Sequence, residues 1–170
     1  QRKLIASTAP ERRNGEALIV LDALNPAEQA RIVHYYLPGQ RRVRLIPNNS
    51  FELPDPITSG ASTYDDVQLF NGSMERLDLK LVGKKEMIVP YNDYRMLYQT
   101  SLDDLLLSNH LNPDRLRWEL HRVWVVEATV KPGMRHLYAK RTFYIDEDSW
   151  QLLAADQYDR FQRVTHYREY

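Results

Sequence analysis

The sequence predicts a mainly β domain of the α+β class, built from antiparallel strands with local connections. Short runs of β-branched and aromatic residues alternate with Pro/Gly or acidic turns. A unit of apolar strand, turn and basic return strand recurs at 37–43, 82–89 and 130–137. Helix-capping signals occur at the start of short segments. A length of 170 residues suits one domain, so we expect a single domain over residues 1–170.

The N-terminal third is predicted to be β-structure followed by a loop. A Leu-Pro-Gly-Gln turn at 37–40 is expected to join two strands, because Pro suits the second position and Gly the third position of a type II turn. Residues 47–61 are rich in Pro, Asn and Ser, which predicts a loop. The predicted strands are 1–5, 16–23, 30–37 and 41–46.

The middle of the chain mixes helical and extended signals. The sequences TYDD (63–66) and SLDD (101–104) each place a hydroxyl three residues before a carboxylate, which is typical of a capping box. Short helices are therefore expected at 64–70 and 101–108. Strands are predicted at 78–82, 86–89 and 94–99, with a Gly-Lys-Lys turn between the first two. The last residues, 163–170, are also strand-like.

The strongest pattern is a β-meander over residues 117–159. Three strand-like runs are separated by KPGM (131–134) and DEDS (146–149). If Pro-Gly forms a two-residue turn, Lys131 pairs with Met134, and residue 124 lies opposite residue 141. A four-residue turn at 146–149 then adds the even-numbered residues 150–158 to the same face. A slip of one residue would exchange the two faces.

One face of this meander is apolar and rich in tryptophan, yet charged residues interrupt it. Two interpretations stay open. Arg141 and Asp156 form a structural ion pair, with Arg122 or Arg141 stacked on Trp124, or these charges are a polar anchor inside an apolar ligand cavity. The candidate ligand-binding residues are Trp118, Leu120, Arg122, Trp124, Arg141, Phe143, Leu152 and Asp156.

Composition and motifs exclude several classes of function. The 23 basic residues equal the 23 acidic residues, which argues against a nucleic-acid binder. The absence of cysteine excludes thiolate chemistry and disulfides, and no apolar run reaches the ~20 residues of a membrane span. The five histidines lack metal-ligand spacing, and neither a nucleophile motif nor a glycine-rich phosphate motif occurs. We therefore expect no metal, no cofactor and no enzymatic activity. The basic run at 41–44 is interpreted as a solvated strand edge.

Three strings together resemble one protein family. They are YLPGQRRVRLIPN (36–48), TYDDVQLFNGSMERLDLKLVGKKEMIVPYN (63–92) and the meander at 117–159. They are similar to bacterial proteins catalogued as the domain of unknown function 1329 family, grouped with the outer-membrane lipoprotein-sorting, or Lol-like, superfamily. This resemblance implies a curled antiparallel sheet, or incomplete β-barrel, with short helices on its concave side. It also implies that the chain is an interior portion of a longer protein.

The function that the resemblance implies is a non-enzymatic periplasmic carrier or binding protein for a lipophilic ligand. Its partners would be a hydrophobic ligand or lipid, and an envelope protein, in outer-membrane lipoprotein or lipid traffic of Gram-negative bacteria. The alternative is a structural or interaction module that docks through the exposed strand edge at 41–46. A third hypothesis, an enzyme acting on envelope lipids or esters, needs a nucleophile–base pair that the sequence does not reveal.

Overall fold

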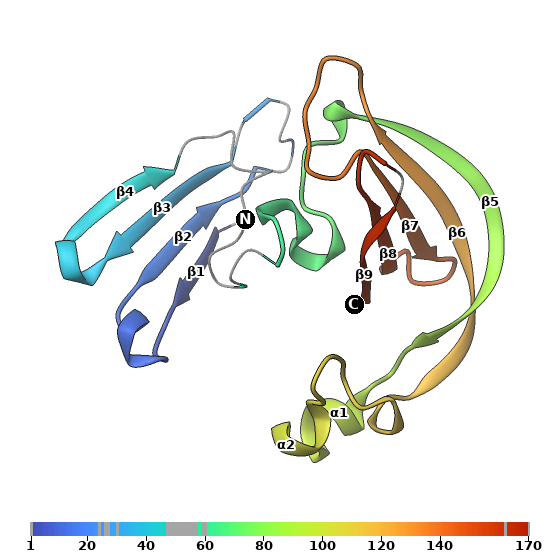
Figure 1. Ribbon diagram of the computed structural model, residues 1–170, viewed down its shortest axis with the longest axis horizontal. Coiled ribbons are helices and arrows are strands. Elements are labelled where there is room, and N and C mark those ends of the chain that lie inside the picture. Colours follow the sequence, from blue (N-terminus) through green and yellow to red (C-terminus); the bar gives the residue numbers. More distant parts are fainter. Residues whose placement is uncertain are drawn as a thin grey trace. The chain divides into compact units, whose positions relative to one another are not determined.

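The computed structural model describes residues 2–23, 25, 28–29, 31–46, 58, 61–161 and 163–169. The chain divides into two compact units, residues 1–75 (unit 1) and 76–170 (unit 2), each with its own antiparallel sheet (Figure 1). Neither sheet closes on itself, and the helices are short. The predicted mainly β class is therefore confirmed, while the single-domain prediction for 1–170 stays a prediction.

Unit 1 contains a four-stranded sheet in the order β1-β2-β3-β4. Leu37 pairs with Arg42, which confirms the hairpin predicted at 37–40. The turn itself is a 3-10 turn, η2 (Pro38–Gln40), and Arg41, with a φ of 49°, takes the left-handed conformation expected for Gly39. The predicted loop at 47–61 lies almost entirely outside the described residues. The bounds are β1 (Arg2–Ala6), η1 (Glu11–Arg13), β2 (Ala17–Leu21), β3 (Ile32–Leu37) and β4 (Arg42–Ile46).

The helix predicted at 64–70 is present as a pair of 3-10 turns, η4 (Tyr64–Leu69). Its capping box forms as expected: the Thr63 N–H donates to Asp66 Oδ2 at 2.8 Å, and the Thr63 hydroxyl donates to the same oxygen at 2.9 Å. The segment breaks at Val67 and Gln68, where Gln68 has a φ of 55°. Thr63 and Asp66 are both buried, so the cap belongs to the interior of unit 1.

Unit 2 contains a five-stranded sheet in the order β5-β6-β7-β8-β9. The turn predicted at 83–85 is wrong, because residues 77–90 form one strand with a bulge between Leu81 and Gly83. The bulge leaves Val82 without a cross-strand partner, while Gly83 pairs with Val125 and the pairing with β6 continues to Pro90. The bounds are η5 (Met74–Arg76), β5 (Leu77–Pro90), β6 (Trp118–Val130), β7 (Lys140–Asp146), β8 (Leu152–Tyr158) and β9 (Val164–Glu169).

Two short helices lie at the end of the β5–β6 hairpin (Figure 1). The first, α1 (Tyr94–Gln99), replaces a predicted strand, because these residues lie beyond the paired length of β5 and β6. The second, α2 (Leu102–Leu105), starts where predicted, with Ser101 Oγ accepting the Asp104 N–H at 3.3 Å, but ends earlier. A 3-10 turn, η6 (Pro113–Arg115), then leads into β6. Within the described residues, no helix is long and apolar enough to cross a membrane.

The predicted register of the first two meander strands is wrong by four residues. Trp124 lies opposite Ile145, where Arg141 was expected. The cause is the connection, because a loop over residues 131–139 replaces the two-residue Pro-Gly turn. A shift by an even number of residues keeps each side chain on its face, so Trp124, Phe143 and Arg141 still share one face, as predicted.

In the third strand of the meander, most side chains lie on the opposite face of the sheet from the one predicted. Arg141 pairs with Gln157 and Tyr144 pairs with Ala154, with a bulge next to Tyr144. The connection between β7 and β8 is also longer than the predicted turn, because β8 begins at Leu152. Residues 154, 156 and 158 therefore lie on the other face of the sheet from Trp124.

The apolar core of unit 2 lies on the face that was predicted to be the wetter one. Its buried members are Val89, Val123, Tyr144, Leu153 and Ala154. The opposite face also buries side chains, among them Ala128 of β6 and Phe143 of β7. The sheet is thus covered on one face near the middle of β6 and on both faces near β7.

Candidate functional site

An apolar pocket lies in unit 1 between the four-stranded sheet and η4. Alternation along the strands places Leu18 and Val20 of β2 on the same face as Val33 of β3, and Tyr64 and Val67 contribute from η4. The pocket encloses about 80 Å³. Its lining residues are Lys3, Ile5, Leu18, Val20, Asp22, Arg31, Val33, Ile46, Tyr64, Val67 and Asn71.

A buried arginine closes one end of this pocket. Arg31 is 9% exposed, and its Nε lies 2.5 Å from Asp22 Oδ1. Its two terminal nitrogens donate to the backbone carbonyls of Tyr64 (3.4 Å) and Asn71 (2.9 Å). Arg31 therefore ties η4 and its C-terminal end to the sheet. Because its charge is engaged by Asp22, it borders the apolar space without leaving an uncompensated charge.

A second polar network lines a smaller, neighbouring pocket, which shares Ile5, Leu18 and Tyr64 with the first. Tyr35 donates its hydroxyl to Glu16 Oε2 at 2.7 Å, and Arg13 Nε donates to the same oxygen at 3.0 Å. The hydrogen bond from Tyr35, together with Arg13, lowers the pKa of Glu16. Burial, followed by the hydrogen bond to Glu16, raises the pKa of Tyr35. This network keeps Glu16 ionised and Tyr35 protonated at neutral pH.

The geometry suits binding of an apolar group rather than chemistry on it. Strand side chains form the walls, and two of the charged residues in the lining, Asp22 and Arg31, are paired with each other. Ligand pockets in proteins commonly enclose about 300–1,000 Å³, so a volume of about 80 Å³ is large enough for only a segment of a larger apolar molecule.

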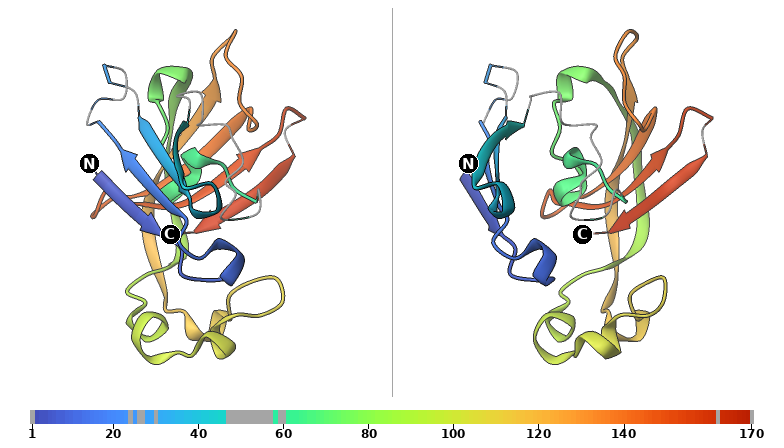
Figure 2. Two further views of the ribbon diagram at one scale, coloured as in Figure 1. Left: turned by 90° about the vertical axis from the view of Figure 1, so that its left-hand side faces the viewer. Right: turned by 60° about the vertical axis from the view of Figure 1, so that its left-hand side comes forward.

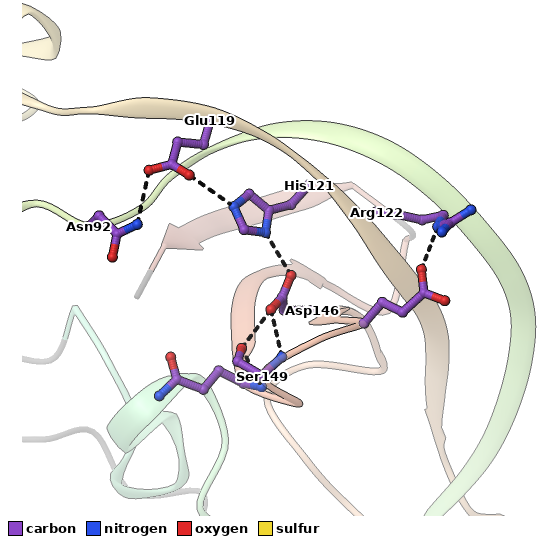
Figure 3. Close-up of polar contacts among 8 residues, drawn as sticks. Asn92, Glu119, His121, Arg122, Asp146 and Ser149 are labelled. Atoms are coloured by element: carbon purple, nitrogen blue, oxygen red, sulfur yellow. Dashed lines mark hydrogen bonds and ion pairs between the residues drawn. The ribbon is translucent and has the colours of Figure 1, made fainter.

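A buried polar cluster lies in unit 2, where the β7–β8 connection meets β6 (Figure 3). Asp146, 1% exposed, accepts hydrogen bonds from the Ser149 N–H (2.9 Å) and the Ser149 hydroxyl (2.6 Å). Its other oxygen lies 2.8 Å from His121 Nδ1. On the far side of that ring, Glu119 lies 3.5 Å from His121 Nε2 and accepts a hydrogen bond from Asn92 at 3.1 Å. The cluster thus links the segment that follows β5 with β6 and the end of β7.

The direction of these hydrogen bonds limits what the cluster can do chemically. In a serine hydrolase, histidine takes the serine proton and the carboxylate orients the histidine. Here Ser149 donates to Asp146, so His121 is not positioned as the base for this hydroxyl. The Tyr91 ring also packs against His121, with ring centroids 4.1 Å apart. The arrangement connects strands and does not activate Ser149 as a nucleophile.

The acid stability of unit 2 is expected to depend on Asp146. Burial raises the pKa of this carboxyl, but the hydrogen bonds from Ser149 and His121 outweigh burial and leave the pKa below its ordinary value. A lowered folded-state pKa stabilises the protein above about pH 4, and this stabilisation is lost as the pH falls through the folded-state value. Denaturant unfolding of wild type and Asp146→Asn between pH 7 and pH 3 should give a flatter pH profile for the variant. Parallel profiles would contradict the assignment.

Seven of the eight predicted ligand-binding residues share one face of the five-stranded sheet. They are Trp118, Leu120, Arg122, Trp124, Arg141, Phe143 and Leu152. The face is not uniform: Leu120 is 66% exposed and Arg122 is exposed, whereas Arg141 and Phe143 are buried. Their role in ligand binding stays a prediction.

The predicted pair between Arg141 and Asp156 is wrong. Asp156 lies on the opposite face, where it accepts the Tyr144 hydroxyl at 2.7 Å. The Arg141 guanidinium instead lies over the Tyr138 ring, 5.0 Å from its centroid. The cause is the register of β8, which differs from the prediction by an odd number of residues and therefore places Asp156 on the opposite face of the sheet.

The predicted stacking of an arginine on Trp124 is also wrong. The Lys84 ammonium lies over the Trp124 ring, 3.9 Å from its centroid. Arg122 forms an ion pair with Glu147. Lys84 reaches the ring because it is the cross-strand neighbour of Trp124.

Sequence reasoning missed the pocket of unit 1, although two local signals point to it. Leu18, Val20 and Asp22 alternate along β2, and Arg31, Val33 and Tyr35 alternate along β3, so each strand has an apolar middle next to a polar residue. The polar cluster also had a signal, because Asp followed by Ser three residues later favours a side-chain-capped turn. Neither signal shows which distant residues meet.

Comparison with known proteins places this fold and sequence in a family. A family model described as a protein of unknown function, DUF1329, matches residues 1–169. An uncharacterized protein of Pseudomonas aeruginosa is 46% identical over 153 residues, which cover 89% of this chain and 34% of the relative. The chain thus spans about a third of this curated relative.

Two crystal structures share the fold. A DUF1329 family protein from Desulfovibrio piger has a TM-score of 0.59 and 19% identity, covering 96% of this chain and 53% of that chain. A domain from Vibrio parahaemolyticus, provisionally named as an outer membrane lipoprotein-sorting protein domain, has a TM-score of 0.58, 17% identity and the same coverage, 96% and 53%. The fold is therefore Lol-like, as the resemblance implied. Because the family model matches nearly the whole sequence, the chain belongs to the DUF1329 family.

Proposed function

We propose that this chain holds the apolar part of a lipophilic ligand in the pocket of unit 1, as a non-enzymatic carrier or binding domain. The observation that carries this proposal is the pocket itself, which has strand side chains as walls, Tyr64 and Val67 of η4 in its lining and the Arg31–Asp22 ion pair at its margin. Such a combination of apolar lining and few oriented polar groups is how small-molecule sites are generally built.

The fold relatives support a place for this function in the Gram-negative cell envelope. The Vibrio parahaemolyticus domain carries a name from lipoprotein sorting and shares the fold. We infer that the chain acts in the periplasm, in outer-membrane lipoprotein or lipid traffic, with a lipid or another hydrophobic molecule as its ligand. The unactivated Ser149 supports the non-enzymatic part of the proposal.

Filling the pocket is expected to weaken ligand binding. Val20 lines the pocket, so Val20→Trp places an indole in a space of about 80 Å³. Palmitate binding, measured by native mass spectrometry and by displacement of a fluorescent fatty acid, should weaken by about tenfold or more, equivalent to about 1.4 kcal/mol. Ile19→Trp is the matched control, because Ile19 lies next to Val20 on the same strand but on the opposite face, 42% exposed.

A third variant separates this pocket from the predicted meander site. Leu120→Glu places a charge on the exposed part of the face that bears Trp118 and Trp124. If Leu120→Glu removes palmitate binding and Val20→Trp leaves it unchanged, the ligand lies on the meander face and the pocket proposal fails. Equal binding by all three variants and wild type would also contradict the proposal.

A further inference from the structure

The basic run at 41–44 lies at an edge of the unit 1 sheet. β4 is the last strand of the four-stranded sheet, as Figure 1 and both views of Figure 2 show. Within the described part of the chain, no strand pairs with its outer edge. Residues 41–45 are exposed along this edge. An open edge offers backbone N–H and C=O groups to another extended chain.

The charges along this edge all have the same sign. Residues 37–46 contain Arg41, Arg42 and Arg44 and no acidic residue. The cross-strand neighbours of Arg42 and Arg44 on β3 are Leu37 and Tyr35, which cannot neutralise them. Among the described residues, Gln40 is the one side chain hydrogen-bonded to any of these guanidinium groups, through Arg44 at 2.6 Å. A strand added beside β4 would meet this positive charge directly.

The two faces of β4 carry different kinds of side chain. Arg42 and Arg44 project on the face that also carries the pocket, because Ile46 on that face lines it. Val43 and Leu45, each 63% exposed, project on the other face. There, Leu45 continues a cross-strand row with His34, Ile19 and Leu4, of which Leu4 is 70% exposed. A partner strand thus meets arginines on one face and the exposed apolar side chains of Val43 and Leu45 on the other.

We propose that β4 binds an extended partner segment in which acidic residues alternate with apolar residues, added to the sheet as a fifth strand. Acidic side chains opposite Arg42 and Arg44 pair with the two guanidinium groups, and apolar side chains opposite Val43 and Leu45 pack against these exposed residues. A second copy of this chain fits poorly, because antiparallel pairing of two β4 strands brings their arginines together. A solvated edge alone leaves the exposed Val43 and Leu45 on its other face unexplained. This proposal is independent of the pocket in unit 1.

A designed peptide tests the proposal with the whole chain. The probe is a synthetic peptide alternating glutamate with valine, and binding is measured by fluorescence anisotropy at low and high salt. We expect saturable, salt-sensitive binding, and new protection of amides 42–46 from hydrogen exchange. The double variant Arg42→Glu with Arg44→Glu should weaken this binding by about tenfold or more and should instead bind a peptide that alternates lysine with valine.

Matched controls distinguish binding of an alternating acidic and apolar segment from non-specific charge attraction and from binding of a second copy of the chain. Arg95→Glu with Arg160→Glu changes the formal charge of the chain equally, at two exposed positions in unit 2, and should leave binding unchanged. A peptide with the same composition but its glutamates in one block should not bind. Equal binding of both peptides, equal loss in both double variants, or no protection of 42–46 overturns the proposal. Self-association that the Arg42/Arg44 variant abolishes, seen by light scattering, assigns the edge to a second copy and also overturns it.

Discussion

Replacing Arg31 by alanine is expected to destabilise unit 1 by about 3–5 kcal/mol, the largest effect of any single substitution proposed here. The change leaves Asp22 without its buried counter-charge and removes the donors that hold the carbonyls of Tyr64 and Asn71. Because these bonds attach η4 to the sheet, the cover of the pocket is expected to loosen along with the strands beneath it.

Hydrogen exchange of backbone amides in unit 1 measures the destabilisation caused by Arg31→Ala. All three tryptophans lie in unit 2, at 118, 124 and 150, so their fluorescence reports on the other unit. Amides of β2, β3 and residues 64–71 should lose protection in Arg31→Ala. Arg12→Ala, at an exposed position in the same unit, should change stability by no more than about 0.5 kcal/mol. The double variant Arg31→Ala with Asp22→Ala should be less destabilised than Arg31→Ala alone, because it removes the uncompensated charge. A loss below about 1 kcal/mol in Arg31→Ala would show that the pair is not structural.

Replacing Asp146 by alanine is expected to destabilise unit 2 by about 2–4 kcal/mol. This carboxylate is 1% exposed and accepts both hydrogen bonds from Ser149 and one contact from His121. Alanine leaves these donors without their acceptor and removes the link between β6 and the β7–β8 connection.

Tryptophan fluorescence suits this measurement, because Trp150 lies in the same connection and Trp124 lies on β6. Asp148→Ala is the matched control, since Asp148 is exposed two residues away and should change stability by no more than about 0.5 kcal/mol. Asp146→Asn retains the shape and one acceptor, so it should fall between wild type and Asp146→Ala. Similar unfolding free energies for Asp146→Ala and Asp148→Ala would rule out a structural role for the cluster.

Local patterns were sufficient for the elements that are determined by local chemistry. The capping boxes at Thr63 and Ser101 start η4 and α2 as predicted, because a side chain three residues away satisfies the first N–H groups. Alternation of apolar and polar residues gave strands at β1–β4 and β6–β9, since a half-buried strand needs one dry face. The same logic failed at Tyr94–Gln99, where β-prone residues lie beyond the reach of a pairing partner and form α1.

Strand pairing limited how far the candidate site could be predicted. The two-residue turn assumed at Pro132-Gly133 is a longer loop. The observed pairing of β6 with β7 therefore differs from the predicted register by four residues, but each side chain lies on the predicted face of the sheet. The bulge beside Tyr144 and the longer β7–β8 connection exchange the two faces of β8 relative to the prediction. A shift of one residue is enough to place Asp156 on the opposite face of the sheet from Arg141. Site geometry depends on which face each side chain occupies, so it could not be inferred from spacing alone.

The sequence by itself determined the β class, the family, the caps and the basic character of β4, because each depends on neighbouring residues or on a continuous string. Only the tertiary structure showed that Arg31 contacts Asp22 and the carbonyls of Tyr64 and Asn71. It also showed that Asp146 contacts His121, 25 positions away in the sequence. Such meetings are set by loop lengths, bulges and the order of strands in a sheet. These long-range contacts cannot be recognised from neighbouring residues in the sequence, yet they form the pocket on which the proposed function depends.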